Sequence, residues 1–273
     1  MKNYLKYFFS ILLMLSCLIL FSMVSYKVLF LDDEKPPKEP EVTEENNENP
    51  PVDNKNHEKP KDDDEVKFVK PEDAPFATVD KSYFKDVLFI GDSRTVGLFE
   101  YGQIEGANFF ANTGMNVYNV REKTVSVSNL GNVTLDKLLS SKQYGKIYLM
   151  LGINELGYDM DQTVKKYKEL VDWLREKNPN GILYIEANMH VAAARSDKDE
   201  IFNNKRIDKF NSRIAEFIDN KSIFYIDVNE LFDDEKGNLG AEYTSDNTHV
   251  LGKYYVEWVD WLLTKAIVLG ENN

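Results

Sequence analysis

Hydrophobic and polar residues follow three different patterns along the chain of 273 residues. Residues 7–31 are almost entirely apolar, and residues 32–80 are polar and rich in proline. From residue 81 onwards, short apolar runs alternate with segments whose apolar residues recur every three or four positions. Short apolar runs are typical of buried parallel strands, and the wider spacing is typical of amphipathic helices. We therefore divide the chain into residues 1–31, 32–80 and 81–273.

The last part predicts a regular alternation of strands and helices. The apolar runs predict strands at residues 87–90, 107–111, 146–151, 182–186 and 222–227, and the wider spacing predicts helices at 94–101, 162–177, 201–218 and 252–268. Residues 117–133 suggest a short hairpin or an irregular excursion, and residues 135–141 a helical turn. Repeated strand–helix units favour a parallel sheet with helices on both faces. We predict an α/β fold, a three-layer α/β/α sandwich with a five-stranded parallel sheet in the order 2-1-3-4-5.

The apolar segment 7–31 is long enough to cross a bilayer as a helix. Lys2 and Lys6 precede it, and three acidic residues follow it directly. The excess of positive charge before the span places the N-terminus in the cytoplasm. We therefore predict that residues 1–31 form a cytoplasmic N-terminus and an uncleaved, single-pass signal anchor. Residues 81–273 would then lie outside the cell membrane, with the N-terminal helix as the membrane contact.

Cys17, the only cysteine, lies within this apolar segment. Residues 14–17, Met-Leu-Ser-Cys, loosely resemble a lipoprotein processing site, so lipidation is one alternative to the anchor, and a buried soluble helix is another. The apolar run continues for more than ten residues beyond Cys17, which favours the anchor. Because residues 81–273 contain no cysteine, a disulfide framework and a Cys-ligated metal site are excluded there.

Charge separates the middle of the chain from the rest. Residues 32–80 hold 17 acidic and seven basic side chains and eight of the nine prolines. Such a segment lacks the apolar content to fold alone, and proline and like charge both extend it. We predict a disordered, acidic, proline-rich linker. Residues 81–273 carry a formal charge of −6, and no part of the chain is basic enough to indicate a nucleic-acid partner.

The tripeptide Gly91-Asp92-Ser93 closes the first predicted strand. Glycine permits a sharp turn there, and Ser93 then lies between the end of a strand and the start of a helix. In open parallel sheets, ligands bind beyond the carboxyl ends of the strands. Ser93 is therefore a candidate nucleophile, although a serine or aspartate at this position can also merely cap the helix.

Two further residues follow predicted strands and can donate hydrogen bonds at the same edge. Asn154 comes after the strand at 146–151, and Gly114 comes after the strand at 107–111. Each could be an ordinary turn residue. Together with the backbone N–H of Ser93, the N–H of Gly114 and the carboxamide of Asn154 supply three donors for a developing oxyanion.

A serine nucleophile needs a base, and residues 81–273 contain only two histidines, His190 and His249. Asp246 lies three residues before His249 and can accept a hydrogen bond from Nδ1, leaving Nε2 to accept the proton of Ser93. A capping aspartate beside a structural histidine is the alternative. His190 follows another strand and has no comparable carboxylate nearby in sequence, so we predict that it lines the substrate pocket.

This order of motifs resembles the SGNH hydrolases, also known as the GDSL esterase/lipase family. Residues 89–93 resemble the first block of that family, and residues 152–155, Gly-Ile-Asn-Glu, resemble the third. Asp246-x-x-His249 is similar to the last block. Gly114 occupies the place of the second-block glycine, for which Gly106 is the alternative. The resemblance covers most of residues 86–268 and implies a flavodoxin-like arrangement of the sheet.

Two positions depart from the pattern of that family. Arg94 stands where the family name has leucine, a variable position. Glu155 replaces the aspartate that usually follows the asparagine and helps to order its loop. The extra methylene could shift Asn154, but it leaves the carboxamide in place.

The resemblance implies ester hydrolysis through an acyl-serine intermediate, with Ser93, His249 and Asp246 as the catalytic triad. It calls for no metal and no organic cofactor. We expect a membrane-anchored bacterial esterase that removes a short acyl group, such as O-acetyl, from an ester-bearing small molecule or a cell-wall glycan. The alternatives are a polysaccharide O-acetyltransferase that uses the same site and a non-catalytic wall-binding module. No motif identifies a protein partner.

Overall fold

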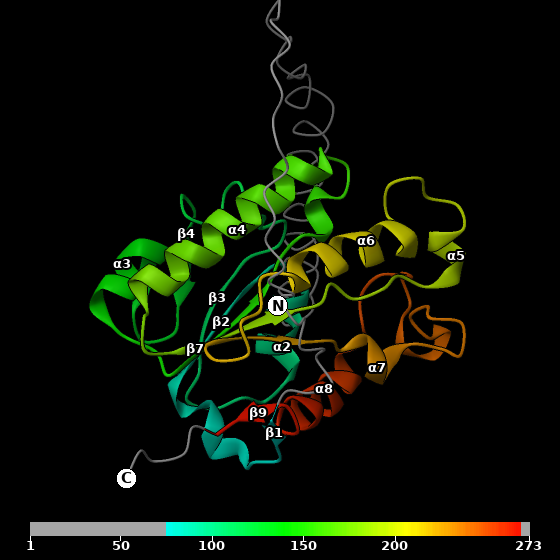
Figure 1. The fold of residues 1–273 in the computed structure, drawn as a ribbon. Coiled ribbons are helices and arrows are strands. Elements are labelled where there is room, and N and C mark those ends of the chain that lie inside the picture. Colours follow the sequence, from blue (N-terminus) through cyan, green and yellow to red (C-terminus); the bar gives the residue numbers. More distant parts are fainter. Residues whose placement is uncertain (1–74, 269–273) are drawn as a thin grey trace, which may run out of the picture. The chain divides into compact units, whose positions relative to one another are not determined.

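A five-stranded parallel sheet forms the centre of the protein in the computed structural model, which describes residues 75–268 (Figure 1). Its strands lie in the order β3-β2-β6-β7-β8, and all neighbouring pairs are parallel. This is the predicted order 2-1-3-4-5, which is therefore confirmed. The strands are β2 (Val87–Gly91), β3 (Asn108–Ala111), β6 (Lys146–Met150), β7 (Ile182–Glu186) and β8 (Ile223–Ile226).

Helices cover both faces of the sheet, as the alternating pattern predicted (Figure 1). One face packs against α3 (Leu135–Ser141), α4 (Met160–Lys177) and α6 (Asn204–Ala215). The other face packs against α2 (Ser93–Tyr101) and α8 (Tyr255–Leu262). The shorter helical segments are η2 (Lys81–Asp86), η3 (Ile153–Glu155), α5 (Ala193–Ser196), α7 (Asn229–Phe232), η4 (Ala241–Tyr243) and η5 (Gly252–Tyr254).

The two ends of the folded part differ from the prediction. The expected helix over 252–268 ends at Leu262, and β9 (Ala266–Ile267) follows it. This strand pairs antiparallel with β1 (Phe76–Ala77), which lies inside the segment predicted to be linker. The two short strands satisfy each other's backbone groups, and this pairing could not be read from either end of the sequence alone.

In two inner segments, the structure defines elements more closely than the sequence patterns did. The ambiguous stretch 117–133 contains an antiparallel hairpin of β4 (Thr124–Val127) and β5 (Gly131–Thr134). The helix expected from residue 201 begins only at Asn204, because the side chain of Asn203 accepts a hydrogen bond from the N–H of Arg206 and caps the helix there.

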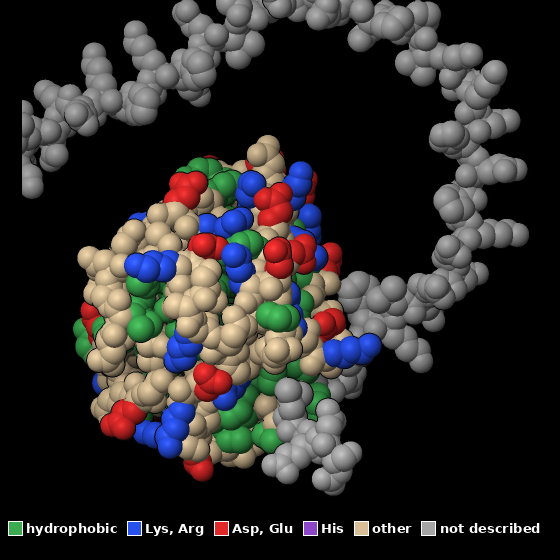
Figure 2. Space-filling model, turned by 90° about the vertical axis from the view of Figure 1, so that its left-hand side faces the viewer, with side chains coloured by type: hydrophobic (Ala, Val, Ile, Leu, Met, Phe, Trp, Pro, Cys, Tyr) green, Lys and Arg blue, Asp and Glu red, His purple; other side chains and the backbone are tan. Residues whose placement is uncertain are grey.

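The predicted anchor and most of the predicted linker, residues 1–74, lie outside the described residues. Within residues 75–268, no helix combines the length and apolar character needed to cross a membrane. On the face shown in Figure 2, basic and acidic side chains are interspersed with each other and with hydrophobic ones. That face offers no continuous basic surface of the kind that binds nucleic acid.

Stacked aromatic rings run across one face of the sheet, between the strands and helices α2 and α8. Phe89 stacks on Phe109 and on Tyr148, with ring centroids 4.8 and 4.9 Å apart. Tyr148 stacks in turn on Tyr184 at 4.4 Å. These residues are direct neighbours in the strand register, so the rings join four strands. Phe89, which takes part in two of these stacks, belongs to β2, the strand that ends just before Ser93.

We expect Phe89→Ala to lower the free energy of unfolding by about 3–5 kcal/mol, because it removes a buried ring and leaves a cavity. Urea denaturation of the full chain measures the change. The matched control is Phe99→Ala, since Phe99 is 53% exposed. A loss at Phe89 no larger than the loss at Phe99 would contradict the role given to the stacked rings.

Glu186, at the end of β7, is buried within the sheet. Its Oε1 has no hydrogen-bond partner among the described residues. Burial raises the pKa of Glu186 to about 8; Arg94 lowers it and Asp92 raises it further. The folded protein therefore holds a proton on Glu186 under conditions in which the unfolded chain has lost it.

We predict that this carboxyl makes the protein less stable as the pH rises. The loss of stability begins above the ordinary pKa of 4.5, where the unfolded chain releases the proton, and is complete above about 8, where the folded protein releases it too. It arises because ionising this buried group costs free energy only in the folded state. Glu186→Gln stays neutral, so the variant should gain stability over wild type between pH 5 and pH 8. Urea denaturation at both pH values measures this gain. A difference between the two proteins that does not change with pH would exclude the buried ionisation.

Candidate active site

Ser93 is the first residue of α2 and directly follows the turn out of β2. Asp92 caps the helix, and its side chain accepts a hydrogen bond from the N–H of Arg94 at 3.0 Å. Gly91 is required at this turn, because a Cβ there would lie 1.9 Å from Oγ1 of Thr95. The sequence Gly-Asp-Ser thus places the hydroxyl of Ser93 at the carboxyl edge of the sheet, as predicted.

The two residues that flank Ser93 form a buried ion pair with each other. Nη2 of Arg94 lies 2.6 Å from Oδ2 of Asp92, and neither side chain is more than 3% exposed. The same Nη2 donates to Oδ1 of Asn188 at 2.9 Å, and Asn188 donates to the carbonyl of Leu151 at 3.0 Å. The ends of β2, β6 and β7 are therefore tied together directly beneath Ser93.

Ser93, His249 and Asp246 form a continuous hydrogen-bonded chain. Oγ of Ser93 lies 2.9 Å from Nε2 of His249. Nδ1 of His249 lies 2.7 Å from Oδ2 of Asp246. The sequence spacing predicted this contact between aspartate and histidine, and the fold brings the pair to a serine 156 positions away.

Asp246 and His249 lie on a loop that is held by its own hydrogen bonds. Oδ1 of Asp246 accepts from the N–H groups of Thr248 and His249 at 2.8 and 2.7 Å. Burial opposes the ionisation of Asp246, but hydrogen bonds from His249 and Thr248 outweigh it and lower the pKa of Asp246 to about 2. The carboxylate stays charged at neutral pH and can stabilise a positive charge on His249.

The predicted oxyanion donors lie around the same pocket. Ser93, Gly114 and Asn154 all line it, together with His249. Gly114 has a φ of +72°, which favours glycine, and no atom lies within 4 Å of a Cβ placed there. Nδ2 of Asn154 donates one hydrogen to the carbonyl of Met115 at 2.9 Å, which leaves its second hydrogen for a ligand.

Glu155 fastens the loop of Asn154 to the loop of Gly114. Its Oε1 accepts a hydrogen bond from the N–H of Val117 at 2.6 Å, and the side chain is buried. The methylene that distinguishes Glu155 from aspartate therefore does not prevent an ordered loop. Burial raises the pKa of Glu155 to about 7, against the opposing effect of the Val117 hydrogen bond.

His190 has a different place from the one predicted. Its Nδ1 and Nε2 lie 2.8 Å from carboxylate oxygens of Asp233 and Asp208 respectively. Burial disfavours its charged form, but the two carboxylates raise the pKa of His190. Its neighbours Met189 and Val191 line the pocket, whereas His190 does not. The carboxylates are distant in sequence, so the spacing alone could not show that both ring nitrogens are occupied.

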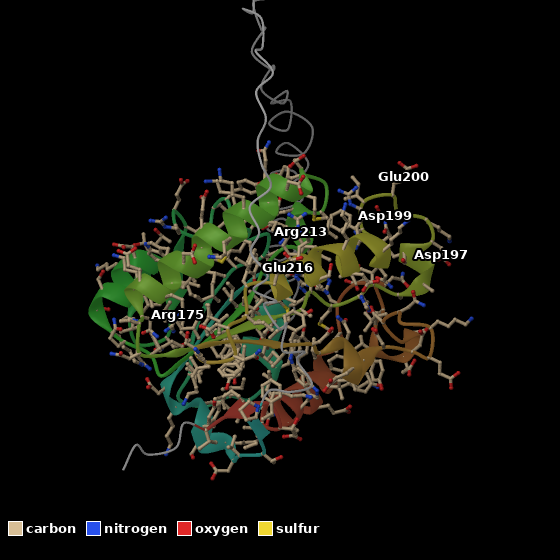
Figure 3. All side chains as sticks on the ribbon, viewed as in Figure 1. Arg175, Asp197, Asp199, Glu200, Arg213 and Glu216 are labelled. Carbon is tan, nitrogen blue, oxygen red and sulfur yellow. The ribbon has the colours of Figure 1, made fainter. Side chains whose placement is uncertain are left out.

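The pocket around Ser93 has a volume of about 270 Å³. Sequence reasoning assigned no site role to eight of the residues that line it, namely Arg94, Thr113, Ile153, Met189, Val191, Arg195, Phe202 and Thr248. Arg195 lies in α5, and Phe202 lies in the loop between α5 and α6, which also carries Asp197, Asp199 and Glu200 (Figure 3). Residues 197–200 had no predicted element and Phe202 was placed in the helix expected at 201–218, with no signal that this segment approaches Ser93.

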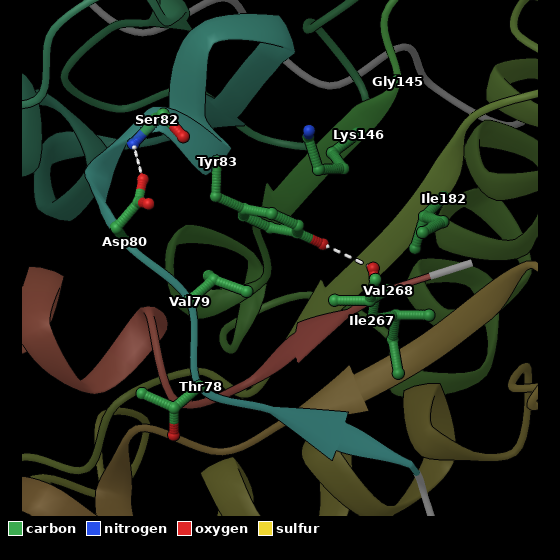
Figure 4. A pocket seen from close by; sticks show the side chains of 10 residues that line it. All are labelled: Thr78, Val79, Asp80, Ser82, Tyr83, Gly145, Lys146, Ile182, Ile267 and Val268. Atoms are coloured by element: carbon green, nitrogen blue, oxygen red, sulfur yellow. Dashed lines mark hydrogen bonds between the residues drawn. The ribbon is translucent and has the colours of Figure 1, made fainter. Parts of the chain in front are cut away.

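A larger hollow, of about 750 Å³, lies at the opposite edge of the sheet. It is lined by Lys146 and Ile182, at the starts of β6 and β7, and by Tyr83, which donates to the carbonyl of Ile267 at 3.0 Å (Figure 4). It contains none of the predicted catalytic residues. Within residues 75–268, no three His, Cys, Asp or Glu side chains are grouped to hold a metal ion.

Solved structures of other proteins resemble the fold. Among the solved structures, a GDSL-like lipase from Bacteroides thetaiotaomicron has a TM-score of 0.51 and 18% sequence identity, covering 70% of this chain and 91% of that one. A Streptococcus pneumonia protein whose name refers to platelet activating factor has a TM-score of 0.50 and 17% identity, covering 67% and 90%. At these identities the likeness shows the fold alone.

No curated protein matches the sequence. The model of the GDSL-like lipase/acylhydrolase family matches residues 89–253, which is more than half of the chain and includes Ser93, Gly114, Asn154, Asp246 and His249. The chain therefore belongs to the GDSL-like lipase/acylhydrolase family and is a serine esterase of the SGNH type.

Proposed function

We propose that this protein hydrolyses short-chain acyl esters, such as O-acetyl groups, on a carbohydrate or cell-wall glycan outside the cell membrane. The proposed hydrolysis rests on the hydrogen bonds that link Ser93 to His249 and His249 to Asp246, at 2.9 and 2.7 Å. The potential donors of Gly114 and Asn154 line the same pocket. This arrangement satisfies the geometric requirements of a nucleophile, a base, an orienting group and an oxyanion site.

Each residue has a defined part in the reaction. Oγ of Ser93 attacks the ester carbonyl carbon while its proton passes to Nε2 of His249. The N–H groups of Ser93 and Gly114 and the carboxamide of Asn154 hold the oxygen that becomes negative. His249 then gives the proton to the departing alcohol, which leaves an acyl group on Ser93. In the second half of the reaction, His249 takes a proton from water as the water oxygen bonds to the acyl carbon. The bond from that carbon to Oγ of Ser93 then breaks, His249 returns the proton to Oγ, and the acid leaves.

The dimensions of the pocket favour a short acyl group. Its volume of about 270 Å³ is shared between the acyl group and part of the alcohol. Sites for drug-sized ligands usually begin at about 300 Å³. A long lipid chain would need an extended apolar channel, whereas polar residues such as Asn154, Thr113 and Arg195 form part of this wall.

The location outside the membrane rests on the sequence alone. Residues 7–31 are long and apolar enough to anchor the chain, and Lys2 and Lys6 precede them. An anchored esterase of this orientation would meet wall polymers before any other ester, which favours a glycan substrate.

We expect Ser93→Ala and His249→Ala to lower kcat for p-nitrophenyl acetate by about 10⁵-fold, because serine and histidine of a triad act as one unit. Asn154→Ala should lower kcat by about 10²–10³-fold through loss of one oxyanion donor. Ser212→Ala is the matched control, since Ser212 lies on the exposed side of α6. Activity that survives both triad changes would refute the mechanism, and acetyl transfer to a sugar in preference to water would favour the acetyltransferase.

The location has its own test. A protease added to intact cells should remove the domain of residues 81–273 while leaving a membrane-bound N-terminal fragment. Cells opened before treatment serve as the control for protease activity. Protection of the domain in intact cells, with cleavage only after opening, would place it on the cytoplasmic side and refute the proposed orientation.

A further inference from the structure

Arg195, in the short helix α5, lies at the boundary between two hollows. It lines the pocket that contains Ser93 and His249, and it also lines an adjoining hollow of about 540 Å³. An ester bound at Ser93 with its acyl group in the first pocket has its alcohol portion directed out of that pocket. Arg195 is placed to contact that portion where the second hollow begins.

The guanidinium of Arg195 is held in position from three sides. It lies over the ring of Phe202, 4.6 Å from the centroid. Nη1 donates to Oγ1 of Thr248, the residue before His249. Nε donates to Oδ2 of Asp199 at 3.5 Å. Among the described residues Nη2 has no acceptor, so the ordered guanidinium keeps free N–H groups.

The charge of Arg195 is only weakly compensated. Its pair with Asp199 is long, at 3.5 Å, and both side chains are 31% exposed, so an incoming anion can compete for it. Arg94, the other cation of the pocket, is neutralised by Asp92 at 2.6 Å. No aspartate or glutamate lines the Ser93 pocket. The lining of the Ser93 pocket is therefore positive, whereas the adjoining hollow has Asp199, Glu200 and Asp246 beside Arg195 and Lys198, so an anion is favoured on the side of Arg195 that faces Ser93.

We propose that Arg195 is a specificity residue that binds a carboxylate on the alcohol portion of the ester, so that the preferred substrate is an acylated acidic sugar. A guanidinium matches the planar carboxylate with two parallel hydrogen bonds, and a single cation matches a single negative charge. The proposal rests on the esterase function proposed above. It adds the chemical class of the alcohol, which the triad alone does not define.

The experiment compares two substrates that differ only in charge. They are an O-acetylated methyl glucuronoside with a free carboxylate and the same compound with that carboxylate as its methyl ester. Acetate release by the full chain gives kcat/KM for each. The variants are Arg195→Gln, Arg195→Lys and, as a matched control, Arg213→Gln. Arg213 is 33% exposed and paired with Asp161, but it lies on α6 and lines neither hollow (Figure 3).

We expect wild type to prefer the free carboxylate. Arg195→Gln should reduce the ratio of the two kcat/KM values about tenfold or more, through loss of a charge-assisted hydrogen bond. Arg195→Lys should retain part of the preference, and Arg213→Gln should keep the wild-type ratio. An unchanged ratio in Arg195→Gln would overturn the proposal. So would an equal loss on both substrates, because that result would mean that Arg195 only supports the loop of His249 through Thr248.

Failure of the esterase function would be recognised separately. If wild type released acetate from neither compound, calorimetric binding of the two sugars to the full chain and to its Arg195→Gln variant would still test the site. If wild type binds the sugar with the free carboxylate more tightly than its methyl ester, and Arg195→Gln loses this preference, the result supports the proposal even though no ester is hydrolysed. Equal binding of both sugars to wild type overturns it.

Discussion

The site depends on the buried ion pair between Asp92 and Arg94, the two residues on either side of Ser93. A charged pair without access to water persists only when its hydrogen bonds are nearly complete, and removing one partner from such a pair costs about 3–5 kcal/mol. Nε and Nη2 of Arg94 donate to Asp92 and Asn188, while its buried Nη1 has no partner among the described residues. The pair thereby fixes the backbone of Ser93 from both sides and joins it to the loop after β7.

The other two residues of the proposed triad are held in a different way. His249 and Asp246 lie on a loop with side chains 42% and 53% exposed, and their order comes from local hydrogen bonds rather than from burial. In the proposed mechanism, a nucleophile at the start of a helix thus faces a base on a surface loop. The exposure of His249 would let water reach the acyl group when the acyl-serine is hydrolysed.

Negative charge beneath the site is kept low by protonation. The pKa values of Glu155 and Glu186 are raised to about 7 and about 8, chiefly by burial. Both carboxyls lie near enough to Asp92 and Arg94 for these charges to shift their pKa values. At pH 7, Glu186 is therefore mostly protonated and Glu155 about half protonated, so the two carboxyls add less negative charge near the ion pair than two ionised glutamates would.

The strands of the sheet and the candidate residues Ser93, Gly114 and Asn154 could be predicted because apolar periodicity and strand ends are local signals. The strand order and the placing of Asp246 and His249 beside Ser93 followed from the repeated strand–helix pattern and the family resemblance. What escaped prediction depends on pairing across long sequence separations. Examples are the strand pair of Phe76–Ala77 with Ala266–Ile267, the two carboxylates that hold His190, and the approach of Arg195 to the pocket. Arg94 was treated as a variable position because it stands where the family name has leucine, and its contact with Asn188, 94 residues away, had no signal in the sequence.

The most direct test of the mechanism is to trap the acyl-enzyme. The full chain is mixed with an acetyl ester, stopped with acid during turnover, digested, and mapped by mass spectrometry. The mechanism predicts an acetyl group on the peptide that contains Ser93, at the hydroxyl 2.9 Å from His249, and no such group in Ser93→Ala. Turnover of the ester with no acetyl group on Ser93, or with the group on another residue, would contradict it.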